Sequence, residues 1–192
     1  PGVVLASAAK EYMKVYGVLV GKKPVIFTNN DSAYETAIEF KKNNINPVVL
    51  DSRKNPQSEI IKEALSLGIE VKFSHVVVAA KGYKKVKSCD IAMISDNKEN
   101  LIDISNIQCD CICVSGFWTP TIHLASQSGS KTKFMEDIDA FIPDKSKQKE
   151  ITLGSANGIF TLDETLKTSF QKGYELSKEI TNKDNKTQTH IT

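Results

Sequence analysis

Short apolar runs alternate with segments of helical periodicity over residues 25–73 of the chain. Residues 25–28, 47–50 and 69–73 are rich in apolar, largely β-branched side chains and are bounded by polar turns, a pattern typical of buried strands. The segments between them place apolar residues three and four positions apart and therefore predict helices. The order strand, helix, strand, helix, strand predicts a right-handed parallel βαβαβ unit.

Local signals predict where these two helices begin and end. Ser32 and Glu35 have the spacing of a capping box, in which the serine hydroxyl accepts from a backbone N–H and the glutamate reaches back to the helix start. Pro56 stands at the favoured first position of the next helix. Gly68 is the expected C-terminal cap of that helix.

Two more helices are predicted near the ends of the chain. Residues 1–16 repeat apolar side chains at helical spacing, and Gly17 ends that helix. Thr161 and Glu164 form a second capping box, which predicts the start of the last helix. The polar stretch after Asn182 is expected to be frayed or to act as a linker. One apolar face of the last helix is formed by Leu162, Leu166, Phe170 and Tyr174.

The alternation of strands and helices ends after the third strand. Residues 76–79, 84–87 and 91–95 are short apolar or alternating runs with no room for helices between them, and Gly82 marks a turn. This pattern predicts a β-meander. Residues 111–115 form a later core strand. Together these elements predict an α/β fold, a Rossmann-like three-layer nucleotide-binding domain with a β-meander.

The composition indicates a folded globular chain. Apolar residues make up 40% and charged residues 25% of the 192 residues, so the chain can bury a core and is not of the disordered class. The net charge of +2 gives no reason to expect a nucleic acid or an acidic membrane as a partner. No apolar run approaches the roughly eighteen residues of a membrane span, and no signal peptide is visible. Because the first residue is Pro1, we expect a piece of a longer chain.

The cysteines favour a reducing compartment. Cys109, Cys111 and Cys113 alternate along one predicted strand and therefore point to one face of it. Their spacing differs from the C-x-x-C pattern that is usual in metal sites. We interpret them, together with Cys89, as buried, reduced thiols of a cytoplasmic protein.

The turn after the first strand, residues 28–32, lies where a Rossmann domain has its glycine-rich phosphate loop. The turn contains no glycine, and Asp31 puts a negative charge where a phosphate would lie, although asparagines tolerate left-handed turns. We therefore favour a remodelled loop over a dinucleotide site. Asp51 ends the second strand, where an acidic residue can bind a ribose hydroxyl, but strands also end in Asp because turns favour it.

Two later segments are candidates for cofactor contact. Residues 109–120 include Gly116 and fit the crossing from the nucleotide domain back to the flavin domain of two-dinucleotide flavoproteins. Trp118 and His123 are candidates for a stacking group and a base, with packing and structural roles as the alternatives. Residues 154–160 place small side chains ahead of a helix N-terminus, which suits a pyrophosphate or a close packing partner, or is a plain loop.

The sequence contains no arrangement typical of catalysis. It has no nucleophile–His–acid triad, no metal-ligand cluster and no redox C-x-x-C motif. We therefore expect no catalytic residue and no metal ligand in this chain.

Four segments resemble the alpha subunit of heterotetrameric sarcosine oxidase: residues 1–9, 25–34, 113–128 and 154–158. The asparagine-rich turn and the Trp-x-Pro-x-x-His-Leu run are the most specific, because they depart from generic flavoprotein patterns. The resemblance extends to about residue 180. It implies that the chain is an internal fragment of a glutathione-reductase-like, two-dinucleotide-binding flavoprotein, with flanking segments of a second FAD/NAD-linked reductase domain.

The resemblance also implies an activity for the complete complex, the oxidative demethylation of sarcosine to glycine with formation of H2O2 and methylenetetrahydrofolate. It implies NAD in the intact alpha subunit, FAD and FMN in the complex, and tetrahydrofolate at a C-terminal domain absent here. The implied partners are the beta, gamma and delta subunits and the remainder of the alpha chain. The residues that this chain would contribute to cofactor binding are Thr119, Leu124, Ser126, Gly116, Trp118, Asn157 and Gly158.

On this basis the chain divides into four parts. We expect a connecting helix from an upstream FAD/NAD-binding-like domain (1–22), the Rossmann-like domain with its meander (23–115), a return segment to the upstream domain (116–180), and a linker or tail (181–192). Two alternatives stay open. One is the alpha chain of a related amine dehydrogenase that acts on N-methylglutamate, dimethylglycine or an opine. The other is a ligand-free interaction module, motivated by the missing glycines of the first turn.

Overall fold

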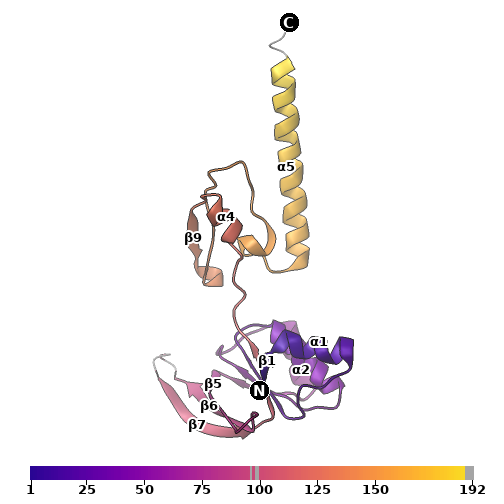
Figure 1. The fold of residues 1–192 in the computed structure, drawn as a ribbon, viewed down its shortest axis with the longest axis vertical. Coiled ribbons are helices and arrows are strands. Elements are labelled where there is room, and N and C mark those ends of the chain that lie inside the picture. The colour runs from indigo at the N-terminus through magenta and orange to yellow at the C-terminus, as the bar shows by residue number, and fades with distance from the viewer. Residues whose placement is uncertain (96, 98–99, 189–192) are drawn as a thin grey trace. The chain divides into compact units, whose positions relative to one another are not determined.

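The computed structural model of the protein describes residues 1–95, 97 and 100–188. The chain divides into two compact units, Pro1–Phe117 and Trp118–Thr192 (Figure 1). The first unit holds almost all of the buried apolar side chains, and the second is built around one long helix. Each unit is described separately below.

The first unit is organised around a five-stranded sheet of order β1-β8-β2-β3-β4, in which all neighbouring strands are parallel. The predicted βαβαβ unit forms one part of this sheet. The predicted late core strand, β8, lies between β1 and β2 and completes the sheet centre. The strands are β1 (Val3–Leu5), β2 (Pro24–Thr28), β3 (Val48–Asp51), β4 (Glu70–Phe73) and β8 (Cys111–Ser115).

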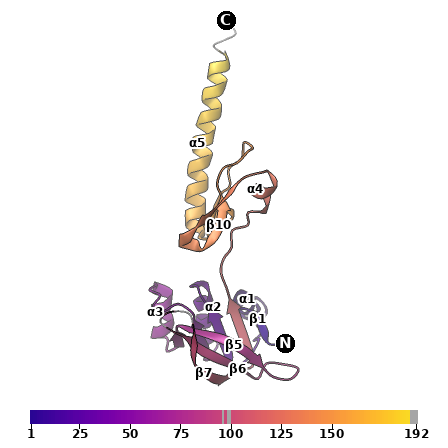
Figure 2. The same cartoon turned by 90° about the vertical axis from the view of Figure 1, so that its left-hand side faces the viewer.

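The sheet is covered on both faces, which confirms the predicted three-layer α/β architecture. Successive residues of a strand point to opposite faces, so Val49 packs with the helices whereas Leu50 packs with the meander. The helix layer contains α1 (Ala6–Tyr16), α2 (Ser32–Lys42) and α3 (Glu59–Ser66). The meander layer is an antiparallel sheet of β5 (His75–Lys81), β6 (Ser88–Ile94) and β7 (Leu101–Gln108). Figure 2 shows the meander strands beside the parallel sheet.

Several predicted boundaries in this unit were wrong. The helix predicted over residues 1–16 begins only at Ala6, because residues 3–5 pair with β8 as strand β1. The third helix starts at Glu59 rather than at Pro56, and Ser58 precedes it as the N-cap. Residues 84–87 form no strand, and β7, which was not predicted, supplies the third meander strand instead. The pairing of β1 with β8, which is distant in sequence, decided the first of these differences, and such pairing leaves little trace in local sequence patterns.

The capping box predicted at Ser32 is absent as well. The residue at the N-cap position is Asp31, and no side chain caps the helix from there. The hydroxyl of Ser32 donates to Asn30 Oδ1 at 2.6 Å, and Glu35 pairs with Lys10 of helix α1. The predicted stop at Gly17 is confirmed by its left-handed φ of 63°.

The second unit contains little regular structure before its last helix. It contains α4 (His123–Gln127), a hairpin of β9 (Thr132–Met135) and β10 (Ala140–Pro143), two short 3-10 segments, η1 (Glu136–Ile138) and η2 (Gly154–Asn157), and α5 (Leu162–Gln188). Thr161 Oγ1 donates to Glu164 Oε2 at 2.8 Å, so the predicted pair does meet at the start of α5. The backbone stays helical past Asn182 as far as Gln188, and residues 189–192 lie outside the described residues. None of the described helices is both long and apolar enough to cross a membrane.

Candidate functional site

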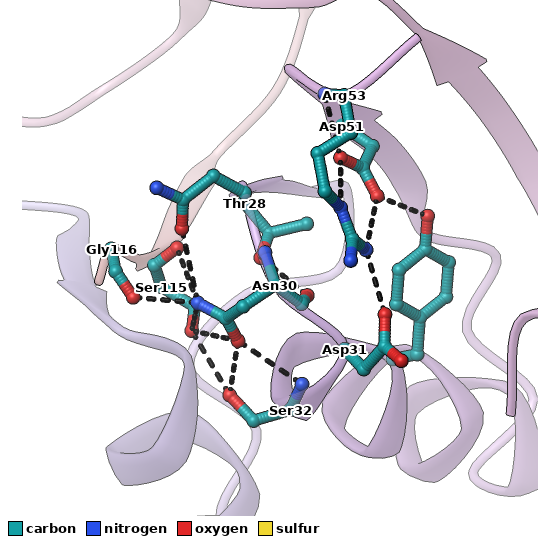
Figure 3. Close-up of polar contacts among 10 residues, drawn as sticks. Thr28, Asn30, Asp31, Ser32, Asp51, Arg53, Ser115 and Gly116 are labelled. Carbon is teal, nitrogen blue, oxygen red and sulfur yellow. Dashed lines mark hydrogen bonds and ion pairs between the residues drawn. The ribbon is translucent and has the colours of Figure 1, made fainter. Parts of the chain in front are cut away.

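The turn between β2 and α2 lies at the carboxyl edge of the parallel sheet (Figure 3). Chain connections run from β2 outward to β3 and β4, and the chain then returns to β8 on the other side of β2. This change of direction is the place where open α/β sheets bind ligands. The turn is therefore the first position to test for a dinucleotide.

Asn30 fills the centre of this turn with its own side chain. Its amide nitrogen donates to the carbonyl oxygen of Gly116 at 2.5 Å and lies 3.4 Å from the carbonyl oxygen of Ser115. Its amide oxygen accepts from the backbone N–H of Ser32 at 3.1 Å. The Thr28 hydroxyl lies 3.1 Å from the Asn30 backbone nitrogen, which donates to it. One side chain thus ties the start of α2 to the end of β8, as Figure 3 shows.

These contacts use groups that a phosphate would otherwise need. A pyrophosphate at a Rossmann turn is held by unpaired N–H groups at the helix start. Here the N–H of Ser32 is already bound by Asn30, and the carboxylate of Asp31 forms an ion pair with Arg53 at 2.8 Å beside it.

The ribose position is occupied in the same way. Asp51 is fully buried, and its carboxylate accepts from Tyr34 Oη at 2.8 Å and from the Arg53 guanidinium at 3.0 and 2.8 Å. The backbone N–H of Arg53 adds a further bond at 2.9 Å. Burial, followed by the hydrogen bond to Asp51, raises the pKa of Tyr34 above its ordinary value, so this phenol stays a donor. Asp51, the acidic residue at the expected ribose position, is thus bonded within the fold.

Of the predicted cofactor residues, Gly116 lies at this edge of the sheet. Gly116 follows β8 in the first unit and accepts from Asn30. The remaining predicted residues belong to the second unit. Trp118 is half exposed and contacts the Phe160 ring at a centroid distance of 6.3 Å. Thr119, Leu124 and Ser126 are exposed, the side chain of Leu124 to 82%.

Asn157 and Gly158 line a cavity of about 550 Å³ in the second unit. A volume of this size is within the usual range for small-ligand sites. Gly158 has a left-handed φ of 80°, and a Cβ there would lie 2.7 Å from Ile138 Cδ1. The cavity wall mixes apolar and polar side chains, among them Met135, Ile142, Ile151, Lys133, Asp144 and Glu150.

Glu150 is a polar centre of this cavity that sequence reasoning missed. One oxygen of its carboxylate accepts from Ser130 at 2.9 Å and from Ser146 at 2.8 Å, and Ser128 donates to the same oxygen. The bonds from Ser128, Ser146 and Ser130, in that order, lower the pKa of Glu150 below its ordinary value. Ser128 and Ser130 lie between α4 and β9, whereas Ser146 follows β10, so the three serines are separated in sequence and no local signal identified them.

His123 and the cysteines carry no chemistry that the geometry reveals. His123 is exposed at the start of α4. All four cysteines are buried and unpaired as disulfides, as predicted, and Cys111 and Cys113 lie with their sulfurs 3.5 Å apart. Within the described ranges there is no group of three or more His, Cys, Asp or Glu side chains that could hold a metal ion.

The fold is similar to that of FAD/NAD-linked reductases. Thioredoxin reductase of Lactococcus lactis superposes with a TM-score of 0.58 and 16% identity, covering 81% of this chain and 50% of the reductase. Thioredoxin reductase of T. acidophilum gives 0.55 and 12%, covering 81% and 52%. These likenesses establish the fold class, which confirms the Rossmann-like architecture with flanking reductase segments.

Within that class the chain resembles sarcosine oxidase subunit alpha. It is 29% identical over 175 residues to that subunit from Corynebacterium sp. (strain P-1), which covers 90% of this chain and 18% of the relative. The subunit of Rhizobium meliloti (strain 1021) is 29% identical over 164 residues, covering 81% and 15%. The chain therefore spans less than a fifth of the length of these relatives. No family model matches it.

Proposed function

We propose that this chain is an internal part of a sarcosine oxidase-type alpha subunit. Its first unit is a nucleotide-binding-like scaffold that binds no dinucleotide of its own. Its second unit contributes residues to an NAD site that the remainder of the alpha chain completes. The resemblance to three sarcosine oxidase alpha subunits over most of the chain supports the assignment.

One observation supports a scaffold role for the first unit and a cofactor-binding role for the second. The carboxyl edge of the first unit has its donors and its acidic residue bonded internally through Asn30 and Asp51. In contrast, Thr119, Leu124 and Ser126 are exposed, and the turn with Asn157 and Gly158 opens on a cavity. A turn of small residues just before a helix N-terminus can receive a pyrophosphate, and exposed hydroxyl groups can add hydrogen bonds to it. Trp118, the first residue of the second unit, and Gly116, which is the one proposed residue of the first unit, complete the proposed set.

In the complete complex, this proposal implies oxidation of sarcosine to glycine with H2O2 and methylenetetrahydrofolate as further products. NAD belongs to the alpha subunit, FAD and FMN to the complex, and tetrahydrofolate to a C-terminal domain outside this chain. Beta, gamma and delta subunits are the proposed partners, in the cytoplasm. We assign no catalytic residue to this chain, whose proposed role is to hold a cofactor and to provide scaffold.

The test uses the full-length parent subunit, expressed together with its neighbouring genes. The purified complex is denatured and its cofactors are identified by mass spectrometry. We expect NAD together with FAD and FMN, and peroxide formation from sarcosine in the presence of tetrahydrofolate. Combined Thr119→Ala, Leu124→Ala and Ser126→Ala substitutions should remove NAD, whereas Thr121→Ala, an exposed threonine of the same segment, should retain it.

Two alternatives have their own outcomes in this experiment. Turnover of N-methylglutamate, dimethylglycine or an opine in place of sarcosine would identify a related amine dehydrogenase. A complex free of NAD and flavin would identify a ligand-free interaction module, which the internally bonded turn of the first unit favours.

A further inference from the structure

Positive charge is concentrated at the amino edge of the parallel sheet, opposite the edge that carries Asn30 and Asp51. Strand β2 begins there, directly after Lys22 and Lys23, and the loop that joins β5 to β6 lies beside it. The exposed lysines of these two segments form one group, which we call the lysine cluster. Its members are Lys22, Lys23, Lys81, Lys84, Lys85 and Lys87.

Backbone hydrogen bonds connect the two segments of the cluster through the residues that precede β8. The N–H of Cys109 donates to the carbonyl oxygen of Lys87 at 3.1 Å, and the N–H of Asp110 donates to that of Lys23 at 3.2 Å. The Asp110 carboxylate in turn accepts from the backbone N–H groups of Lys22 and Lys23 at 2.9 and 2.7 Å. The lysines are therefore held side by side by a bonded backbone.

The positive charge of the cluster is not neutralised within the fold. Lys81 forms an ion pair with Asp90 at 2.5 Å, but none of the other five lysines has an ion pair with any residue that the structure describes. Six lysines and two aspartates, Asp90 and Asp110, leave a local excess larger than the net charge of +2 of the whole chain. A surface that only keeps a domain in solution mixes both signs, so this concentration indicates a negatively charged partner.

The cluster lacks the groups that hold a phosphate tightly. Its charges are all lysine ammonium groups, which are point charges without the two-pronged geometry of arginine. The one arginine of the sequence, Arg53, follows β3 at the other edge. The backbone N–H groups of Lys22, Lys23 and Lys87 all donate within the fold, so they form no nest for an anion. Dispersed carboxylates on a protein surface match such a set of separate ammonium groups better.

Tyr83 supplies the contact area that a protein partner needs. Its side chain is 80% exposed in the loop between β5 and β6, and the Lys84 ammonium lies 5.7 Å from the centre of its ring. Tyrosine is enriched in protein interfaces and among the residues that dominate binding energy, whereas charged residues are depleted from the interface core. An exposed tyrosine among lysines therefore has the arrangement of an anchor inside a charged rim.

We propose that the lysine cluster and Tyr83 dock a carboxylate-rich segment of a partner protein, and that the partner is another subunit of the complex. The lysines steer the acidic partner toward the surface, and Tyr83 anchors it. Because the cluster lies at the amino edge of the sheet, docking leaves the carboxyl edge with Asn30 and Gly116 uncovered. The inference rests on the proposed function only for the existence of other subunits.

Carbodiimide cross-linking of the purified full complex tests this docking, because the reagent joins an amine directly to a carboxylate that touches it. We expect mass spectrometry to find peptides that link Lys84 or Lys85 to an aspartate or glutamate of another subunit. The yield should fall at least about threefold when the salt is raised from about 0.1 to 1 M, which shortens the screening length from about 10 to 3 Å. Cluster cross-links that stay within the alpha chain, or none at all while other inter-subunit links form, would overturn the proposal.

Matched charge reversals measure the contribution of the cluster to association. Lys85→Glu should slow the binding of the alpha subunit to the remaining subunits at least about fivefold at low salt, because it weakens electrostatic steering. Lys62→Glu makes the same charge change on helix α3, outside the cluster, and should leave the rate unchanged, as should Lys85→Arg. Tyr83→Ala should instead raise the dissociation rate. Biolayer interferometry measures both rates, and equal association rates for Lys85→Glu and Lys62→Glu would contradict the proposal.

Other anionic partners give different results in these experiments. Binding of the alpha subunit to vesicles that contain phosphatidylserine, or to a DNA duplex, without any cross-link to a carboxylate would indicate a phosphate-bearing partner and would also overturn the proposal. Cofactors measured on the same cross-linked samples keep the two hypotheses apart. A complex that contains NAD and flavin but lacks the cross-link contradicts the docking alone. The cross-link in a complex without NAD contradicts the proposed NAD site alone.

Discussion

Asp51 is a buried carboxylate whose donors come from three directions. Tyr34, the Arg53 side chain and the Arg53 backbone all donate to it, and no part of its side chain is exposed. A buried charge is tolerated only when it is paired and hydrogen-bonded, and removing one partner leaves the others unsatisfied. The sequence alone left a ribose contact and a plain turn residue as alternatives for Asp51, because an aspartate at the end of a strand is compatible with both.

Replacing Asp51 by Ala should therefore destabilise the protein without affecting NAD content. We expect a loss of about 3 kcal/mol in the free energy of unfolding, since the Arg53 guanidinium and the Tyr34 hydroxyl lose their acceptor. Urea denaturation of the parent subunit, followed by circular dichroism, measures this. Asp163→Ala, which removes an exposed i,i+4 ion pair, is the control and should cost about 0.5 kcal/mol or less.

The cysteines should be unreactive in the folded protein. Burial raises the pKa of Cys109 to about 12, so its thiolate is scarce near pH 8, and the thiolate is the reactive form. We expect negligible labelling of the native chain by a thiol reagent at pH 8 and labelling of all four thiols after unfolding. Rapid labelling of the native protein would contradict the buried assignment.

The same pKa shift makes a prediction for alkaline stability. In the unfolded chain the Cys109 thiol titrates near its reference value of about 8.5. The folded protein keeps that proton up to about pH 12. The stability that this pKa shift contributes is therefore complete below the unfolded pKa and is lost as the pH rises from there toward 12. The free energy of unfolding of Cys109→Ala should depend less on pH across this window than that of the parent protein, as measured by urea titrations at several pH values.

At the scale of elements, side-chain spacing predicted where helices lie better than how they start. Both capping-box motifs have the right residues, yet only Thr161 forms a hydrogen bond with its glutamate. Ser32 instead donates to Asn30, and Glu35 forms an ion pair with Lys10. Strand β7 was missed although its partner β6 directly precedes it along the chain. Strand β1 was missed because it is defined by its pairing with β8, which is distant in sequence. Local propensity cannot report such pairings.

The turn at Gly82 belongs to this scale, because it joins two segments of the meander. Its φ is 152°, and a Cβ there would lie 2.0 Å from the carbonyl oxygen of Lys85. Because the backbone at Lys85 can move away only at a large energetic cost, Gly82→Ala should lower the free energy of unfolding by about 3 kcal/mol. Gly68 also has a left-handed φ, 70°, but open space around it, so Gly68→Ala should cost only about 1–2 kcal/mol. Thermal denaturation of the two variants compares them, and equal losses would show that the clash is relieved.

At the scale of the whole molecule, the burial of apolar side chains differs sharply between the two units. The first unit contains both hydrophobic clusters, one on each face of the parallel sheet. Among its described residues the second unit has three buried hydrophobic side chains, and the apolar side chains of α5 are exposed. Cooperative stability follows buried apolar area, so the units should differ in stability when the chain is isolated.

Limited proteolysis of the 192-residue chain checks this difference. Residues 116–119 are exposed and lie outside helices and strands, which is where proteases cut first. We expect chymotrypsin to cleave at Phe117 or Trp118 and then to degrade the second unit, leaving a resistant fragment near Pro1–Phe117. A resistant second unit would contradict the expected difference in stability between the two units.

The sequence by itself determined the α/β class, the βαβαβ order and the buried cysteine strand, because periodicity and turn residues act over short distances. It also determined the resemblance to sarcosine oxidase alpha subunits, through the turn at residues 28–32 and the run around Trp118. The tertiary structure decided which groups the side chains of Asn30 and Asp51 bind. Their acceptors and donors on β8, α2 and the end of β3 come together only when the sheet forms, so whether the carboxyl edge holds a ligand or its own side chains is a property of the folded chain.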